Sequence, residues 1–416
     1  MSLEEMITAV AADARAASRK LRNASSTVKN RALTHMADLL LARSAPILEA
    51  NRKDLALASG LSGAMLERLT LSEKILADMA DGIREVAALP DPVGAVTGMW
   101  KRPNGLSVGK MRIPLGVIGF IYESRPNVTA DAAALCLKSG NSVILRGGSE
   151  ALRSNLAIEK VLKEALADSG LPAEGIQMIP VTEREAMKIL LSLEGLIDLV
   201  IPRGGEGLIR FVADNSRIPV LKHYKGVCHI FVDRSADPAM ASDICFNAKV
   251  HRPGVCNAME TMLVHERIAE KFIPPVVQRL ADAGVEIRGC PNICRLAPEA
   301  LPASESDWGR EFLSLVLAVK VVSSLDEALD HIERHGSNHT EAIITSDYAN
   351  ARRFVDEVDA SAVIVNASTR FNDGNQLGLG AEIGISTTKL HAYGPMGLEE
   401  LTTTKFTVFG DGQIRA

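Results

Sequence analysis

The chain has 416 residues, of which 47% are hydrophobic and 23% charged, with a formal net charge of −5. This length exceeds what one compact core usually holds and predicts two domains. The mixed charge and the 4% aromatic content argue against a nucleic-acid partner. No apolar run reaches the length of a membrane span, and the acidic start at Met1–Glu5 is unlike a signal peptide. We therefore expect a cytoplasmic protein with no membrane partner.

The two ends of the chain carry helical and strand-like patterns. From Ser2 to about Leu89, apolar residues recur at intervals of three and four, which predicts helices. Two strand-like runs, Met99–Arg102 and Leu106–Ile113, flank a Pro-Asn-Gly turn and predict a hairpin with exposed edges. The last segment, Thr402–Phe409, is also strand-like.

Between these ends, apolar runs of strand length alternate with turns and helical segments. Expected strands are 116–122, 142–145, 196–201, 228–233, 261–264, 317–322, 342–345 and 362–366. Strands that alternate with helices are typical of open parallel sheets. The series restarts near Lys225, so we predict two α/β domains that meet there.

Two of the turns that follow strands contain glycine pairs, Arg146-Gly147-Gly148-Ser149 and Arg203-Gly204-Gly205. At such a turn glycine lets the backbone approach a phosphate, and the following helix offers free N–H groups. Neither turn spells G-x-G-x-x-G, and a tight turn that needs glycine explains each about as well. The two turns together modestly favour dinucleotide binding.

The segment from His251 to Asn257, His-Arg-Pro-Gly-Val-Cys-Asn, suits a nucleophilic thiol at Cys256. Arg252 and the N–H groups of the Pro-Gly turn would favour the thiolate, although a small buried hydrophobic residue is the alternative. His251 or His223 could serve as the base of a Cys/His hydrolase. The six cysteines are scattered, as in a reducing compartment, and Cys290 with Cys294 lacks a second ligand pair, so we predict no metal site.

Residues 366–374 begin where a predicted strand ends, the edge at which ligands of open α/β sheets bind. Polar and cationic side chains there could receive a charged substrate. An ordinary solvated loop is the alternative.

Several segments in the same order resemble one known family. They are Tyr122–Thr129, Leu145–Gly148, Ile201–Gly205, Arg252–Asn257, Asn366–Gly374 and Gly394–Leu401. Together they resemble the gamma-glutamyl phosphate reductases of the aldehyde dehydrogenase superfamily over nearly the whole chain. One departure is Tyr393, where the family pattern leads us to expect an arginine.

The resemblance implies an α/β fold of the aldehyde dehydrogenase type, with two open parallel-sheet domains and a β-hairpin oligomerisation element. It implies a dinucleotide-binding domain at residues 1–95 and 115–225. A catalytic domain would span residues 226–399, and oligomerisation strands would span residues 96–114 and 400–416.

The implied reaction is the NADPH-dependent reduction of L-glutamate 5-phosphate to L-glutamate 5-semialdehyde with release of phosphate, a step of proline biosynthesis, through a thioester on Cys256. Implied partners are the substrate, further copies of the chain and, through channelling, glutamate 5-kinase. Aldehyde-oxidising relatives carry a hydrolytic glutamate on the segment resembling Leu221–Gly226, which here has no acidic residue. The rival functions are an aldehyde dehydrogenase that oxidises a semialdehyde to a free acid and a non-catalytic nucleotide-binding protein.

The resemblance also assigns roles to individual residues. Cys256 is the expected nucleophile, and its own N–H with the amide of Asn127 or Asn257 would stabilise the oxyanion. The expected cofactor-binding residues are Arg146, Gly147, Gly148, Ser149, Arg203, Gly204, Gly205 and Glu311, the last resembling the glutamate that holds the nicotinamide ribose. The expected substrate-binding residues are Arg125, Arg252, Ser368 and Arg370.

Overall fold

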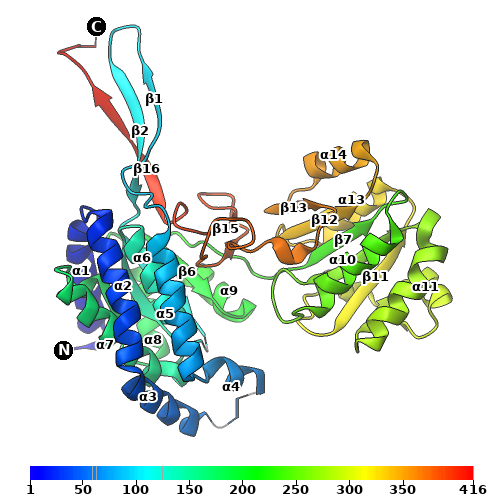
Figure 1. The fold of residues 1–416 in the computed structure, drawn as a ribbon, viewed down its shortest axis with the longest axis horizontal. Coiled ribbons are helices and arrows are strands. Elements are labelled where there is room, and N and C mark those ends of the chain that lie inside the picture. Colours follow the sequence, from blue (N-terminus) through cyan, green and yellow to red (C-terminus); the bar gives the residue numbers. More distant parts are fainter. Residues whose placement is uncertain (59, 62, 124, 416) are drawn as a thin grey trace. The chain divides into compact units, whose positions relative to one another are not determined.

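The computed structural model describes residues 1–58, 60–61, 63–123 and 125–415. Ser124, within the motif Tyr122–Thr129, lies outside the described residues. The chain divides into two compact units (Figure 1). The first consists of Met1–Lys222, Leu379–Gly384 and Met396–Ala416, and the second of His223–Gly378 and Ile385–Pro395.

This division differs from the predicted range of the catalytic domain, 226–399, because two parts of that range belong to the first unit. Backbone pairing explains the difference, since Ile383 N–H donates to Met396 O at 2.8 Å and Met396 N–H donates to Gly384 O at 2.7 Å. The segment Leu379–Gly384 and the segment that starts at Met396 therefore lie side by side in the first unit. The assignment of cofactor binding to one unit and catalysis to the other stays a prediction.

The first unit begins with the expected helices. They are α1 (Leu3–Leu21), α2 (Ser26–Ala42), α3 (Ser44–Leu57), α4 (Gly63–Leu69) and α5 (Glu73–Ala88). Ser2 and Glu5 form a capping box that satisfies free N–H groups at the start of α1. The side chains of Ile7, Ala11 and Ala14 lie on one buried face of this helix, as their spacing predicts.

The sheet of the first unit has four parallel strands in the order β5-β4-β3-β6. Their bounds are β3 (Val117–Tyr122), β4 (Ser142–Arg146), β5 (Ile176–Met178) and β6 (Leu199–Arg203), and the helices between and after them are α6 (Asn127–Lys138), α7 (Leu152–Asp168), α8 (Arg184–Ser192) and α9 (Glu206–Asn215). Every residue of β3 is buried, as its continuous apolar run predicts.

Strand β6 begins three residues later than predicted, at Leu199 instead of residue 196. The preceding residues close a turn, because Ile197 N–H donates to Leu193 O at 3.1 Å. The Asp198 carboxylate then accepts from Val117 N–H at 2.7 Å and pairs with Arg15 at 2.8 Å. The apolar pattern alone did not separate this turn from the strand.

The second unit contains seven parallel strands in the order β10-β9-β11-β8-β7-β12-β13. The strands are β7 (Cys228–Val232), β8 (Met259–His265), β9 (Glu286–Gly289), β10 (Leu301–Pro302), β11 (Val316–Val322), β12 (Thr340–Ile344) and β13 (Ala362–Val365). The helices are α10 (Pro238–Val250), α11 (Glu266–Asp282), α12 (Pro291–Leu296), α13 (Leu325–His335) and α14 (Tyr348–Glu357). The prediction of two open parallel sheets is confirmed.

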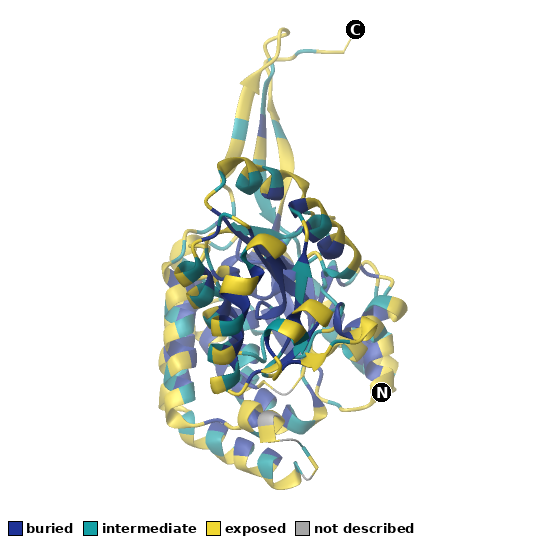
Figure 2. Ribbon diagram, turned by 90° about the vertical axis from the view of Figure 1, so that its right-hand side faces the viewer, coloured by how far each residue is buried: buried dark blue, intermediate teal, exposed yellow. Residues whose placement is uncertain are grey.

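The predicted hairpin is also confirmed, as β1 (Val96–Lys101) and β2 (Ser107–Pro114). Strand β16 (Thr402–Phe409) adds antiparallel to β2, in register from Thr402 opposite Pro114 to Phe409 opposite Ser107. Most residues of this small sheet are exposed (Figure 2, yellow). In the described part of the chain, no helix is both long enough and apolar enough to cross a bilayer.

Candidate active site

Cys256 lies in the loop between α10 and β8, at the amino-terminal edge of the second unit's sheet. Because all strands of this sheet are parallel, the residues that precede β7 and β12 lie at the same edge. The thiol is half-buried, and Cys228 Sγ donates to the Cys256 carbonyl oxygen at 3.2 Å. The loop is thereby fixed to the start of β7.

Gly226 holds this loop through a very close backbone approach. A Cβ atom at residue 226 would lie 2.0 Å from Cys256 O and 2.9 Å from Cys256 Cα, so only glycine fits there. The Gly226 N–H donates to Glu311 Oε1 at 2.8 Å. Glu311 is therefore positioned beside the cysteine loop by a residue that itself contacts that loop.

The Arg370 guanidinium interacts electrostatically with both Cys256 and Arg252. Burial lowers the pKa of Arg370, and the charge of Arg252 lowers it further, while Asp373 and Cys256 raise it. Arg370 Nε also lies 3.5 Å from His251 Nδ1. Positive charge beside a half-exposed cysteine is the environment in which reactive thiolates are found.

Two imidazoles approach the same thiol. One nitrogen of His223, one nitrogen of His339 and the Cys256 sulfur all lie within 4.8 Å of one another. Sequence reasoning considered His223 and missed His339, which directly precedes β12. Attention to residues just before parallel strands would have found it, whereas the rule that ligands bind at carboxyl ends directs attention to the other edge.

The segment 366–374 begins at the carboxyl edge, where the Asn366 side chain accepts from Thr345 N–H at 2.9 Å. It then runs back to the amino edge, where Asn372 Nδ2 donates to Thr340 Oγ1 at 2.7 Å and Asn372 O accepts from Asn257 Nδ2 at 3.0 Å. The segment thus begins at the predicted edge, and the short helix Thr369–Phe371 then carries Arg370 back towards Cys256.

Two other predicted residues of this region are buried. Asn257 commits one amide N–H to Asn372 O, and the Ser368 hydroxyl accepts from Arg370 N–H at 3.3 Å. Tyr393 replaces the expected arginine, and its hydroxyl donates to Asp359 Oδ1 at 3.4 Å. The catalytic role of Asn257 and the substrate contact of Ser368 stay predictions.

In the first unit, the turn after β4 leaves little room for a Cβ atom at Gly147. A Cβ on Gly147 would lie 2.1 Å from the buried Asn155 amide, and one on Gly148 would lie 2.1 Å from the Glu150 carboxylate. Arg146 donates to Gly147 O at 2.8 Å and to Thr182 O at 3.1 Å. Ser149 starts a single turn of 3-10 helix that leads into α7.

The turn after β6 already holds an acidic side chain. Gly205 N–H donates to Glu123 Oε2 at 2.9 Å, and a Cβ on Gly204 would lie 2.4 Å from the same oxygen. Strands β4 and β6 lie on opposite sides of β3, so the turns after β3 and β6 flank the point where strand order reverses. Dinucleotides bind at such a point in open α/β sheets.

Asn127 is the first residue of α6, and its amide donates to Asp131 Oδ2 at 3.4 Å. Burial raises the pKa of Asp131 to about 6, while Asn127 and the charge of Arg203 oppose that rise. Arg125, just before the helix, is exposed. The predicted residues Arg125, Asn127 and Arg203 therefore lie around the start of α6 in the first unit.

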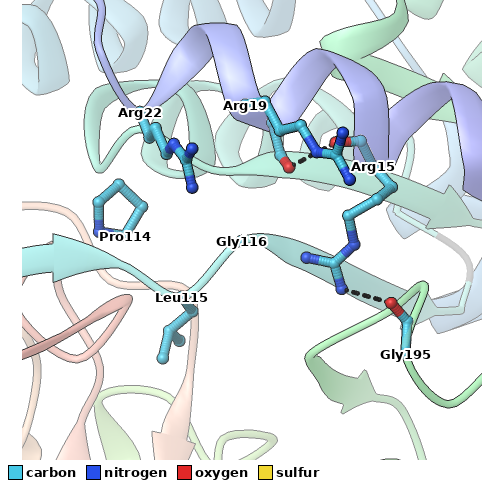
Figure 3. Close-up of a pocket in the computed structure, with 8 residues that line it drawn as sticks. Arg15, Arg19, Arg22, Pro114, Leu115, Gly116 and Gly195 are labelled. Atoms are coloured by element: carbon cyan, nitrogen blue, oxygen red, sulfur yellow. Dashed lines mark hydrogen bonds between the residues drawn. The ribbon is translucent and has the colours of Figure 1, made fainter.

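A pocket in the first unit lies elsewhere and contains none of the predicted site residues. Its volume is about 370 Å³, and Arg15, Arg19 and Arg22 of α1 line it together with Gly116 and Gly195 (Figure 3). The Arg15 guanidinium is bound to Asp198 and to Gly195 O. We assign it no part in the reaction.

The aldehyde dehydrogenase family profile matches residues 2–288, more than half of the chain. The chain belongs to the aldehyde dehydrogenase family. A gamma-glutamyl phosphate reductase of Desulfatibacillum aliphaticivorans is 62% identical over the full length of both chains. The crystal structure of a gamma-glutamyl phosphate reductase from Thermotoga maritima is 48% identical, covers 99% of this chain and 100% of its own, and superposes with a TM-score of 0.97. The resemblance seen in the sequence is thereby confirmed.

Members of the aldehyde dehydrogenase family use nicotinamide cofactors. One more distant structure, a glyceraldehyde-3-phosphate dehydrogenase from Methanocaldococcus jannaschii complexed with NADP, is 15% identical; it covers 98% of this chain and 95% of its own, and shares the fold with a TM-score of 0.70. In the present structure the side chains of Asn155, Glu150 and Glu123 lie beside Gly147, Gly148 and Gly204, so the role of these turns in cofactor binding stays a prediction.

Proposed function

We propose that this protein reduces L-glutamate 5-phosphate to L-glutamate 5-semialdehyde with NADPH and releases phosphate, as a step of proline biosynthesis. The observation that carries the proposal is the position of Cys256, half-buried and within the electrostatic influence of Arg370, in a chain that matches gamma-glutamyl phosphate reductases over its full length. A thiolate is a strong nucleophile towards an acyl phosphate, whose phosphate leaves readily.

The chain's own residues perform the covalent steps. The Cys256 sulfur bonds to the acyl carbon, the carbon–oxygen bond to phosphate breaks, and a thioester remains. NADPH supplies the hydride that reduces this carbonyl. Hydride addition leaves a negative charge on the oxygen of a thiohemiacetal; the oxygen electron pair re-forms the carbonyl, the carbon–sulfur bond breaks, and the aldehyde leaves with the thiolate restored. The positive charges of Arg252 and Arg370 suit the substrate's phosphate.

Each addition to the carbonyl creates an oxyanion that requires hydrogen-bond donors already in place. One such donor is worth about 3 kcal/mol where tested. The backbone N–H of Cys256 is the donor we favour, with the Asn127 amide as the predicted side-chain donor. The Asn257 amide is the alternative; each of the two amides already donates one N–H, to Asp131 and to Asn372 O respectively, and has a second N–H to offer.

The rival that oxidises a semialdehyde to a free acid needs a base that activates water against the thioester. The segment Leu221–Gly226 has no acidic residue, although His223 lies within 4.8 Å of the sulfur in the group formed with His339. We expect glutamate semialdehyde to reduce NADP only when phosphate is present. Reduction that proceeds equally well without phosphate would establish the rival, and none under either condition would favour a non-catalytic protein.

The preference for NADPH should depend on Arg146. Its guanidinium donates to Gly147 O in the first glycine turn, and a 2′-phosphate adds the negative charge that it would bind. Arg146→Ala should raise the Michaelis constant for NADPH at least about tenfold and that for NADH much less. Arg184→Ala, two residues beyond Thr182, is the matched control. Equal changes in the Michaelis constants for NADPH and NADH would show that Arg146 does not bind the 2′-phosphate.

The three-stranded sheet should mediate self-association. Phe406 and Val408 alternate onto one face of β16 and are 64% and 56% exposed, which suits contact with a second copy. The double change Phe406→Glu and Val408→Glu should lower the mass measured by light scattering without unfolding the protein. Tyr348→Glu, on exposed α14, is the control. An unchanged mass of the double variant would contradict self-association through this sheet. An unchanged mass after deletion of residues 402–416 would contradict it as well.

We further propose a cytoplasmic location, because all six cysteines are free. A reducing compartment keeps the Cys256 thiol available. We also propose that glutamate 5-kinase transfers the labile acyl phosphate directly to this protein, which would limit hydrolysis of the acyl phosphate. An excess of the inactive Cys256→Ser variant would then compete for the kinase and slow the overall rate of a coupled assay.

A further inference from the structure

The group of His223, His339 and Cys256 has the composition of a metal site. Among the described residues, it is the one set of three histidine, cysteine or acidic side chains found with such converging ligand atoms. We propose that these three residues bind one Zn²⁺ ion, which reversibly blocks the Cys256 thiol. The blocking of activity rests on the proposed function, whereas the metal site does not.

The ligand types select the metal. One thiolate and two imidazoles suit Zn²⁺, whereas Mg²⁺ and Ca²⁺ require oxygen ligands. In a tetrahedral site with Zn–S near ~2.3 Å and Zn–N near ~2.0 Å, ligand atoms lie about 3.3–3.7 Å apart. The present separations are at most 4.8 Å. Side-chain movements of about 1 Å would therefore complete the coordination, and the fourth position would hold water or an anion.

The second nitrogen of each ring has a partner that orients it. His223 Nδ1 lies 2.8 Å from the Ile385 carbonyl oxygen, and His339 Nδ1 lies 2.7 Å from Thr340 Oγ1. Metal-binding histidines commonly use one nitrogen for such a contact and the other for the metal. We therefore assign Nε2 of both rings as the ligand atoms. The two rings already lie edge to face, with centroids 5.4 Å apart.

Zinc binding and the reductase reaction both require an electron pair of the Cys256 sulfur, so they exclude each other. When Zn²⁺ binds, the S–H bond breaks, its proton passes to solvent and a Zn–S bond forms, so the sulfur cannot attack the acyl carbon. Arg370 adds positive charge near Cys256, which weakens binding of a cation. The site should thus bind zinc more weakly than a structural site with four protein ligands and release it to a chelator.

Zinc binding can be measured without any assay of activity. The reduced, EDTA-treated full-length protein should take up one Zn²⁺ per chain in competition with a chromophoric chelator. Cys256→Ser and His223→Gln should each weaken binding on the order of 100-fold. His339→Gln should act similarly, but it alters a buried residue, so His223→Gln provides the decisive test. The double variant Cys290→Ser and Cys294→Ser is the matched control and should bind as tightly as the original protein.

Co²⁺ gives a second readout. The Co²⁺-loaded protein should show a thiolate-to-metal charge-transfer band that is absent from Cys256→Ser, and Zn²⁺ should protect Cys256 from iodoacetamide until EDTA is added. Unchanged affinity in His223→Gln would mean that His223 does not bind the metal and would overturn the three-residue site, as would a loss of binding in the Cys290/Cys294 variant. Zinc binding as expected in a protein with no reductase activity would instead refute the proposed function alone.

Discussion

Replacing Cys256 with serine is expected to lower the reductase rate by at least about 10³-fold while NADPH still binds. Serine is nearly the same size, but its hydroxyl has a far higher pKa than a thiol. His223 and His339 lie near the thiol, yet either imidazole would have to remove the hydroxyl proton during the attack itself. Steady-state kinetics and NADPH fluorescence titration would measure the two effects separately.

The covalent intermediate provides the sharper measurement. The original protein, given acyl phosphate without NADPH, should release phosphate as a burst of about one equivalent per chain. Intact-mass spectrometry should then show one glutamyl group on Cys256 and none on Cys256→Ser. Substantial activity in the serine variant, or an adduct on another cysteine, would contradict the central role of Cys256. Continued phosphate release after the burst would show that His223 or another group hydrolyses the thioester.

Gly226→Ala should also inactivate the enzyme, although Gly226 contributes no side chain to the reaction. The new Cβ would lie 2.0 Å from the Cys256 carbonyl oxygen, a contact with backbone that cannot rotate away. The cysteine loop must therefore shift, and the Gly226 N–H contact with Glu311 must shift with it. A displacement of about 1 Å at the nucleophile can cost 10²-fold, so we expect at least that loss in kcat/KM.

Gly254→Ala is the matched control for this change. It lies in the same loop as Cys256, but its Cβ would meet nothing closer than Leu313 O at 3.8 Å, which is an ordinary contact. We expect activity near that of the original protein. Circular dichroism and thermal unfolding of both variants would separate a local shift from unfolding. Comparable kcat/KM in the two variants would show that the close approach at Gly226 does not set the position of Cys256.

Local pattern was sufficient to predict most elements and to single out Cys256 as the candidate nucleophile. The buried runs at Val117–Tyr122 and Cys228–Val232 predict strands of parallel sheets, because a strand covered on both faces has no polar positions. The spacing of apolar residues predicts the helices before Leu89, because that period is a property of one helix. Cys256 could be singled out because its neighbours along the chain, Arg252 and Gly254, already favour a reactive thiol.

Tertiary structure alone decided which residues surround the thiol. His339 and Arg370 reach Cys256 because β12 lies beside β7 and because Thr369–Phe371 returns to the amino edge of the sheet. Glu123 reaches the Gly204-Gly205 turn because β3 pairs with β6. The order of strands in a sheet depends on contacts between distant parts of the chain, which no local period records. The candidate nucleophile could therefore be chosen from its own segment, whereas the cation, imidazoles and backbone contacts that surround it required the assembled sheet.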